Sequence, residues 1–280
     1  MRETSNPVFR SLPKQQGGYA QFGSGVAGAQ QVAYQAEPYT TQYPSQTGVS
    51  RPMTIDDVVT KTGITLGVLS VVAVISYFLV SANVALAMPF TLVGALGGLA
   101  LVLVATFGRK QDNPAIVLSY AALEGLFLGA ISFVMANIVV SGANAGSLIG
   151  QAVLGTIGVF AGMLVVYKTG AIRVTPKFTR MLVASMVGVL VLMLGNFVLS
   201  MFGTHDGGPL RNGGTMSIIF SLVVIAIAAF SFLLDFDAAD QMIRAGAPEK
   251  AAWGVALGLT VTLVWLYLEI LRLLSYFQQR

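Results

Sequence analysis

Seven apolar runs, each long enough to cross a bilayer as a helix, constrain this sequence more than any other feature. They cover residues 62–81, 86–107, 115–139, 148–167, 181–202, 217–234 and 253–277. A hydrocarbon core of about 30 Å requires about 20 apolar residues per helical span. Membrane-spanning β-strands would alternate polar and apolar residues, which these runs do not. The sequence therefore predicts an all-α, polytopic membrane protein, a bundle of seven transmembrane helices.

Composition narrows the classes of function. Hydrophobic residues make up 55% of the 280 residues and charged residues only 10%, which is too apolar for an ordinary soluble domain. Cysteine is absent and His205 is the single histidine, so thiolate chemistry, iron–sulfur clusters and an H-E-x-x-H zinc helix are excluded. The net charge of +4 comes without a basic stripe interleaved with aromatic residues. We therefore expect no cofactor and no nucleic-acid partner.

The first 52 residues differ sharply from the rest of the chain. They are polar, with scattered tyrosines and no periodic apolar face. This composition predicts a disordered cytoplasmic tail, residues 1–52, ahead of a seven-helix transmembrane domain, residues 53–280. No apolar segment follows the early charges, so we expect no cleavable signal. Thr54, with Asp57 three residues further on, is expected to cap the first helix.

The distribution of lysine and arginine predicts the orientation. Arranging the seven runs in alternating directions gathers ten basic residues on one side: Arg51, Lys61, Arg109, Lys110, Lys168, Arg173, Lys177, Arg180, Arg244 and Lys250. The other side keeps Arg211, Arg272 and Arg280. Because basic residues concentrate in cytoplasmic loops, the amino terminus is expected in the cytoplasm.

Glycines spaced four residues apart occur in several of the runs. Such pairs allow two helices to approach closely. The pairs that we expect to pack in this way are Gly125 with Gly129, Gly158 with Gly162, and Gly254 with Gly258.

Acidic residues inside apolar runs are the main functional signal. An ionisable side chain within a membrane helix is costly, so it indicates a functional site by default. Glu124 and Glu269 are expected about 14 Å and 12 Å from the ends of their helices, at 1.5 Å per residue. Asp235 and Asp237 are expected where the sixth helix ends, with Asp240 in the following loop.

Carboxyl groups in such positions favour cation and proton chemistry. Two neighbouring carboxyl groups in a low-dielectric setting tend to share one proton, and oxygen ligands suit calcium once they are deprotonated. Depth alone favours a pair between Glu269 and Glu124. In the simplest structural interpretation, Arg272 instead pairs with Glu269 at i,i+3 as an internal bridge or latch, and the aspartates cap a helix.

Three segments resemble a known family. They are Glu124-Gly-Leu-Phe-Leu-Gly129, Leu234-Asp-Phe-Asp237 with Gln241-Met-Ile243, and Leu266-Tyr-Leu-Glu269 with the Ile-Leu that follows. Over residues 50–277 the chain resembles the Bax inhibitor 1 family, also called the YccA-like family, in its bacterial branch with a long polar amino-terminal tail. The last segment, similar to the family's Leu-Tyr-Leu-acid pattern, is the most specific of the three.

The resemblance implies both an architecture and an activity. It implies a protein of the bacterial cytoplasmic membrane, a bundle with the last helix near the centre, and a pH-sensitive calcium leak governed by two aspartates, on the sixth and seventh helices. These positions would correspond to Asp237, with Asp235 as the alternative, and to Glu269, which together would take calcium. Two departures are that Glu269 replaces the expected aspartate and that the spacing between the acids is longer.

The expected function is a pH-sensitive cation leak, with calcium as the permeant ion, gated by protonation of buried carboxyl groups. Its partners would be the bilayer, calcium or protons, and other membrane proteins. The alternatives are a regulator that binds membrane proteins without transport, as in proteolysis or the stress response, and a proton-coupled secondary transporter. An intramembrane protease is disfavoured because the sequence lacks Gly-x-Gly-Asp, so we expect no enzyme and no catalytic residues.

Overall fold

A computed structural model describes residues 51–140, 145–202 and 210–278. The predicted tail lies outside this part of the chain, apart from its last two residues. In the described residues, seven helices are long and apolar enough to cross a membrane. They are α1 (Ile55–Ala82), α2 (Ala87–Phe107), α3 (Pro114–Phe133), α4 (Ala145–Thr169), α5 (Pro176–Met201), α6 (Thr215–Arg244) and α7 (Ala252–Gln278). The predicted all-α bundle is confirmed.

Several helices begin where the sequence supplies a cap. The Thr54 side chain accepts a hydrogen bond from the Asp57 backbone N–H, and the Asp57 carboxylate accepts one from the Thr54 backbone, which completes the predicted capping box. Asn113 and Thr175 cap α3 and α5, and each is followed by a proline that is favoured in a first helical turn. Because α1 starts at Ile55, it extends beyond the apolar run predicted from residue 62.

The α1, α2 and α3 helices pack closely because glycine removes side chains from their contacts. A Cβ atom at Gly129 would collide with the backbone carbonyl of Ala73 on α1, and one at Gly94 would lie 2.6 Å from the carbonyl oxygen of Leu123 on α3. The expected close approach is therefore present at Gly129. It is absent at Gly158 and Gly162, where a Cβ atom would meet nothing within 4 Å among the described residues.

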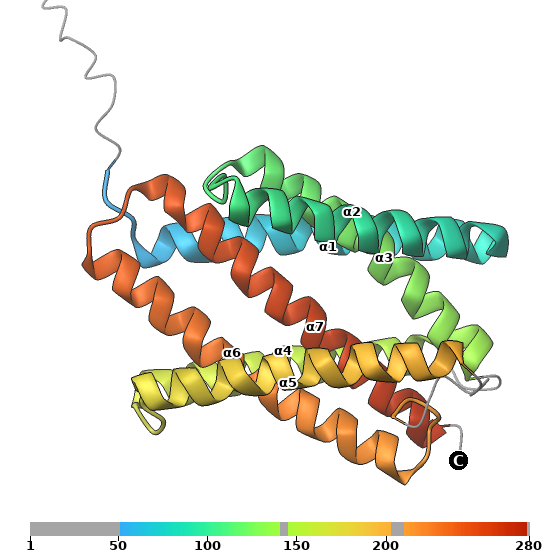
Figure 1. The fold of residues 1–280 in the computed structure, drawn as a ribbon. Coiled ribbons are helices and arrows are strands. Elements are labelled where there is room, and N and C mark those ends of the chain that lie inside the picture. Colours follow the sequence, from blue (N-terminus) through green and yellow to red (C-terminus); the bar gives the residue numbers. More distant parts are fainter. Residues whose placement is uncertain (1–50, 141–144, 203–209, 279–280) are drawn as a thin grey trace, which may run out of the picture. The chain divides into compact units, whose positions relative to one another are not determined.

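The α7 helix lies at the centre of the bundle, as the resemblance implied. It packs against α1, α3, α4 and α6 (Figure 1), and more than half of its membrane-crossing window is buried. Its fully buried side chains include Leu266, Leu271 and Glu269, and Phe232 of α6 lies in the same core as the two leucines. In contrast, most of the side chains of α5 lie on the outside of the bundle.

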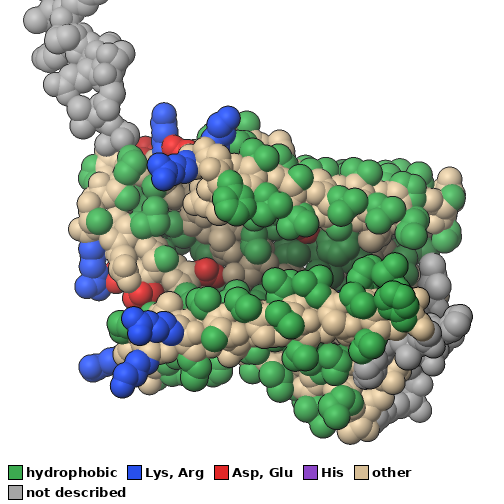
Figure 2. Space-filling model, viewed as in Figure 1, with side chains coloured by type: hydrophobic (Ala, Val, Ile, Leu, Met, Phe, Trp, Pro, Cys, Tyr) green, Lys and Arg blue, Asp and Glu red, His purple; other side chains and the backbone are tan. Residues whose placement is uncertain are grey.

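The two ends of the bundle differ in charge. One end, which we call the basic end, contains the amino-terminal ends of α1, α3, α5 and α7 and the carboxyl-terminal ends of α2, α4 and α6. All ten of the basic residues that the sequence assigned to one side lie here, and Figure 2 shows lysine and arginine gathered on this part of the surface. Arg211 and Arg272 belong to the other half of the bundle, which we call the opposite end.

A short strap joins the start of α1 to the turn between α6 and α7 at the basic end. Met53 N–H donates to the Ala247 carbonyl at 2.8 Å, and Glu249 N–H donates to the Arg51 carbonyl at 3.0 Å. Four charged side chains, which we call the strap network, add ion pairs of 2.6 Å between Arg51 and Asp57, 3.2 Å between Arg51 and Glu249, and 3.3 Å between Lys61 and Glu249. The hydrogen bonds to Asp57 raise the pKa of the Arg51 guanidinium, so Arg51 stays charged at every physiological pH.

Candidate functional site

Glu269 is the buried centre of a cluster of three charges, which we call the arginine cluster, and its two arginine partners are partly exposed. Only 2% of Glu269 is exposed. Its Oε1 atom accepts hydrogen bonds from Arg272 Nη1 at 2.6 Å and from Arg211 Nη2 at 3.1 Å. Two guanidinium groups thus share a single carboxylate oxygen, which leaves the cluster with a net charge of +1.

Hydrogen bonds around the α6 start hold Arg211 in place. The Leu210 N–H donates to the Asn196 side chain of α5 at 3.0 Å, and the Asn212 side chain accepts from Gly214 N–H and from the Ser217 hydroxyl. The Arg211 guanidinium lies 5.9 Å from the centre of the Phe220 ring, within the range of a cation–π interaction. Arg211 therefore reaches Glu269 from a segment fastened to both α5 and α6.

The arginine cluster is not fully satisfied. Glu269 Oε2 and Arg211 Nη1 are buried and have no hydrogen-bond partner among the described residues. A buried charge that lacks a partner for one of its polar atoms carries a desolvation cost, so this arrangement is less stable than a balanced pair. Sequence analysis named Arg272 as the partner of Glu269 from its i,i+3 spacing and missed Arg211, which lies 58 residues from Glu269.

Asp235 is the acid that connects α6 to α7. Its Oδ2 atom accepts a hydrogen bond of 2.7 Å from the Thr262 hydroxyl. Gly258, one turn away on α7, lies next to this carboxylate, and a Cβ atom there would make an ordinary contact of 3.9 Å with Asp235 Oδ1. The expectation that α6 ends near Asp235 is wrong, because the helix continues to Arg244 and places Asp235 about 14 Å from its end at 1.5 Å per residue.

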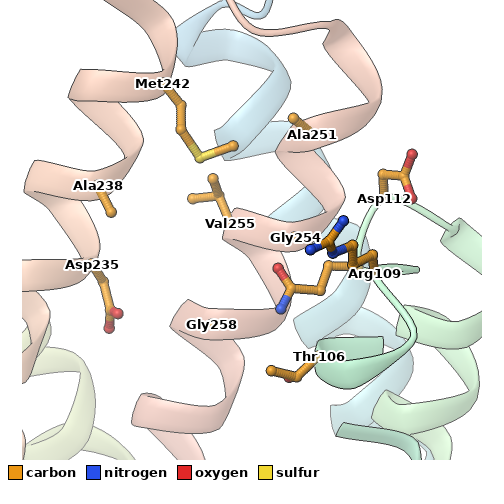
Figure 3. A pocket seen from close by; sticks show the side chains of 11 residues that line it. Thr106, Arg109, Asp112, Asp235, Ala238, Met242, Ala251, Gly254, Val255 and Gly258 are labelled. Carbon is orange, nitrogen blue, oxygen red and sulfur yellow. The ribbon is translucent and has the colours of Figure 1, made fainter. Parts of the chain in front are cut away.

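Asp235 also lines a cavity of about 420 Å³ at the basic end. In Figure 3 Asp235 projects from α6, and Arg109 and Asp112 lie across the cavity on the turn between α2 and α3. Both of these residues are exposed, so the mouth of the cavity reaches solvent. Arg109 has a φ of 52°, an uncommon backbone conformation for a residue other than glycine, where α2 ends.

Asp237 and Asp240 belong to α6, and the expectation that Asp240 lies in a loop is wrong. Asp237 accepts a hydrogen bond of 2.6 Å from the Gln241 side chain, one turn further along the same helix. Asp240 pairs with Arg244 at 2.7 Å and accepts a bond of 3.5 Å from the Tyr167 hydroxyl of α4. The contacts found for these two acids therefore lie on α6 and α4, whereas Asp235 contacts α7.

Glu124 faces α2. A Cβ atom at Gly98 would lie 2.8 Å from Glu124 Oε1, so the absence of a side chain at Gly98 makes room for this acid. Its other oxygen is buried without a hydrogen-bond partner among the described residues. Glu124 is therefore a second semi-buried acid, in a different interface from Glu269.

The structure separates both of the expected acid pairs, Asp237 with Glu269 and Glu124 with Glu269. Asp237 lies about 10 Å from the end of α6 and Glu269 about 26 Å from the start of α7, at 1.5 Å per residue. Because α6 and α7 meet at one turn, these acids differ in depth by about 15 Å. Glu124 lies about 15 Å from the start of α3, also nearer to the basic end than Glu269.

A resident metal site is not evident in the part of the chain that the structure describes. No group of three or more acidic or histidine side chains is close enough there to hold a metal ion. Thr262 adds a hydroxyl oxygen to the carboxylate of Asp235, which together supply fewer oxygens than the six to eight that calcium takes in a stable site. The described residues at Asp235 therefore supply too few oxygens for a stable calcium site.

Comparison with known proteins supports the family resemblance that the sequence indicated. A family model described as Bax inhibitor 1 like matches residues 6–279, which is nearly the whole chain. No curated protein matches the chain at a significant level.

Proposed function

The chain belongs to the Bax inhibitor 1 like family, and from that premise we propose that it is a pH-sensitive leak channel for cations, with calcium as the permeant ion. Protonation of buried carboxyl groups would gate the leak. The protein is a multi-pass membrane protein in contact with the bilayer. In this proposal its basic end faces the cytoplasm of a bacterial cell, as its lysines and arginines favour.

The observation that carries the proposal is the cavity that leads from the basic end to Asp235. A cation that enters from solvent meets a carboxylate joined to α7 through Thr262. Carboxylate and hydroxyl oxygens are ligands that suit calcium. Arg109 and Asp112 line the same cavity with opposite charges, so the net charge of the cavity depends on the charge that Asp235 carries.

The arginine cluster supplies a barrier further along α7. Glu269 lies two turns beyond Thr262, which is about 10 Å at 1.5 Å per residue. Guanidinium groups along a pore exclude cations electrostatically, and this cluster has one positive charge in excess. The described conformation therefore corresponds to a closed leak, and opening requires the guanidinium groups to move away from the path.

Protonation of the buried acids changes the charge that a cation meets along the proposed path. When Asp235 loses its proton it attracts a cation into the cavity, and when it gains one the attraction disappears. The expected cation flux is therefore higher above the titration of Asp235 than below it. Protonation of Glu269 would raise the net charge of the arginine cluster from +1 to +2 and strengthen the barrier, so the protonation of either acid lowers the flux.

Calcium flux into vesicles that contain the purified full-length chain, measured at several pH values, tests the proposal. Asp235→Asn should flatten the pH dependence, because it removes the titrating group at the base of the cavity. Asp237→Asn is the matched control on the same helix and should keep the profile, since Asp237 bonds within α6. The proposal fails if Asp235→Asn leaves the profile unchanged. Concentrative uptake driven by a pH gradient would identify a transporter in place of a leak.

A further inference from the structure

A second cavity, unrelated to the acids, lies between α1 and α4. Its volume is about 750 Å³, and residues of α3 and α7 form its floor. Its lining is almost entirely apolar. We call this cavity the α1–α4 groove. It opens on the outside of the bundle, because several of its lining side chains are also exposed large hydrophobic residues: Val74, Phe78, Val153 and Ile157.

These exposed residues identify the environment of the groove. They lie on membrane-crossing helices, so the surface they form contacts lipid chains rather than water. The groove is therefore continuous with the lipid-facing surface of the protein. Whatever fills it comes from the hydrocarbon region of the bilayer.

The length of the groove matches one leaflet. Its lining on α1 runs from Leu66 to Phe78, and on α4 from Gly146 to Ile157, which is about 17–18 Å on each helix. Gly146 is the second residue of α4, and Phe78 lies in the last turns of α1, so the groove starts near the opposite end of the bundle. Half of a 30 Å hydrocarbon core is about 15 Å.

The groove has room for an extended hydrocarbon chain along its whole length, since it holds about 750 Å³ over about 17–18 Å.

The polar atoms of the groove also favour a hydrocarbon occupant. The Ser132 and Tyr267 hydroxyls bond to each other at 2.7 Å, and the Thr156 hydroxyl donates to the Ala152 carbonyl at 2.8 Å. The hydroxyls of Ser132, Thr156 and Tyr267 are thus bonded within the protein, which leaves an apolar floor, and Ser70 adds an exposed hydroxyl on α1. Gly150 keeps the groove open, because a Cβ atom there would meet nothing within 4 Å.

We propose that the α1–α4 groove binds one acyl chain of a phospholipid from the leaflet at the opposite end. The chain would lie along α1 and α4 above Tyr267, in a position fixed by the protein rather than in the mobile lipid around it. This proposal does not depend on the leak activity.

Spin-labelled phospholipid in vesicles that contain the full-length chain provides the test. A nitroxide in the middle of the acyl chain should show a motionally restricted population that saturates at one chain per protein. Gly150→Phe fills the groove and should abolish this population. Gly158→Phe is the matched control, because Gly158 also has open space around it on α4 but does not line the groove. An equal restricted population in both variants would overturn the proposal.

A second measurement keeps the test decisive if Gly150→Phe does not fold. The natural chain has no cysteine, so Val153→Cys and Leu154→Cys each give a single labelling site, of which only Val153 lines the groove. Brominated acyl chains should quench a fluorophore at position 153 in a saturable way, and one at position 154 in proportion to bulk lipid. Identical quenching at both positions, or cross-linking of the Val153→Cys variant into dimers, would contradict an acyl-chain site.

Discussion

Two networks of ion pairs in this protein use the same residue types in opposite ways. The strap network at the basic end combines Arg51, Lys61, Asp57 and Glu249, so its charges balance, and Arg51 is largely exposed. The arginine cluster combines two guanidinium groups with Glu269 alone, and it lies inside the bundle. The first is a balanced network around the largely exposed Arg51, whereas the second places one excess charge around a buried carboxylate.

The difference indicates different roles. A balanced network at the surface fastens the start of α1 to the α6–α7 turn at little cost, since water and salt stabilise each charge. An unbalanced buried cluster is expensive, and hydrophobic residues of the same volume would be as stable or more stable. We infer that the arginine cluster serves the proposed function through its excess positive charge. The strap network, in contrast, stabilises the fold.

The largest expected loss of stability comes from removing the Glu269 carboxylate. Glu269→Ala leaves two partly buried guanidinium groups without their shared acceptor, and breaking a buried pair typically costs about 3–5 kcal/mol. Denaturant unfolding of the purified protein in mild detergent measures this loss. A cost no larger than that of a surface variant would show that the cluster is already hydrated, and the contrast between the two networks would disappear.

A smaller effect is expected from Arg272→Met. This change removes one hydrogen bond to Glu269 but leaves a neutral pair between Glu269 and Arg211, so the free energy of unfolding should fall by less than about 2 kcal/mol. The same unfolding experiment compares it directly with Glu269→Ala. If Arg272→Met lowers the free energy of unfolding as much as Glu269→Ala does, the excess positive charge does not destabilise the fold.

The smallest loss of stability is expected from a substitution in the strap network. Arg51→Ala removes ion pairs that the largely exposed Arg51 makes to the buried Asp57 and to the partly exposed Glu249, and pairs with one partner in water contribute little. Any loss of thermal stability should shrink as salt rises to about 1 M, where the Debye length is about 3 Å. The cost of Glu269→Ala should change little over the same range, and an equal salt dependence for both variants would remove the distinction.

Much of the fold followed from the sequence, because apolar length and capping are local properties. The seven runs and the Thr54 cap needed no knowledge of distant residues. The site was harder to predict. Successive helical residues turn by 100°, so Asp235 and Asp237 point in different directions, and nothing local to α6 shows which of them meets α7.

Arg211 illustrates a second limit. It lies just before α6, among residues that resemble an ordinary loop, and its role depends on a contact with α7 that no spacing rule anticipates. The available signal was charge. Arg211 is one of only three basic residues that the sequence assigned to the less basic side, and Glu269 is the single acid in the last apolar run.

Calcium flux through two variants of opposite charge tests the central claim most directly. Glu269→Gln raises the net charge of the arginine cluster from +1 to +2, and Arg272→Met lowers it to zero. Glu269→Gln together with Arg272→Met keeps it at +1 and serves as the control for folding. If this cluster is the barrier of a cation leak, flux falls in the first variant, rises in the second and stays near the natural value in the third. Flux that is the same in all three, or that rises in Glu269→Gln, would contradict the account.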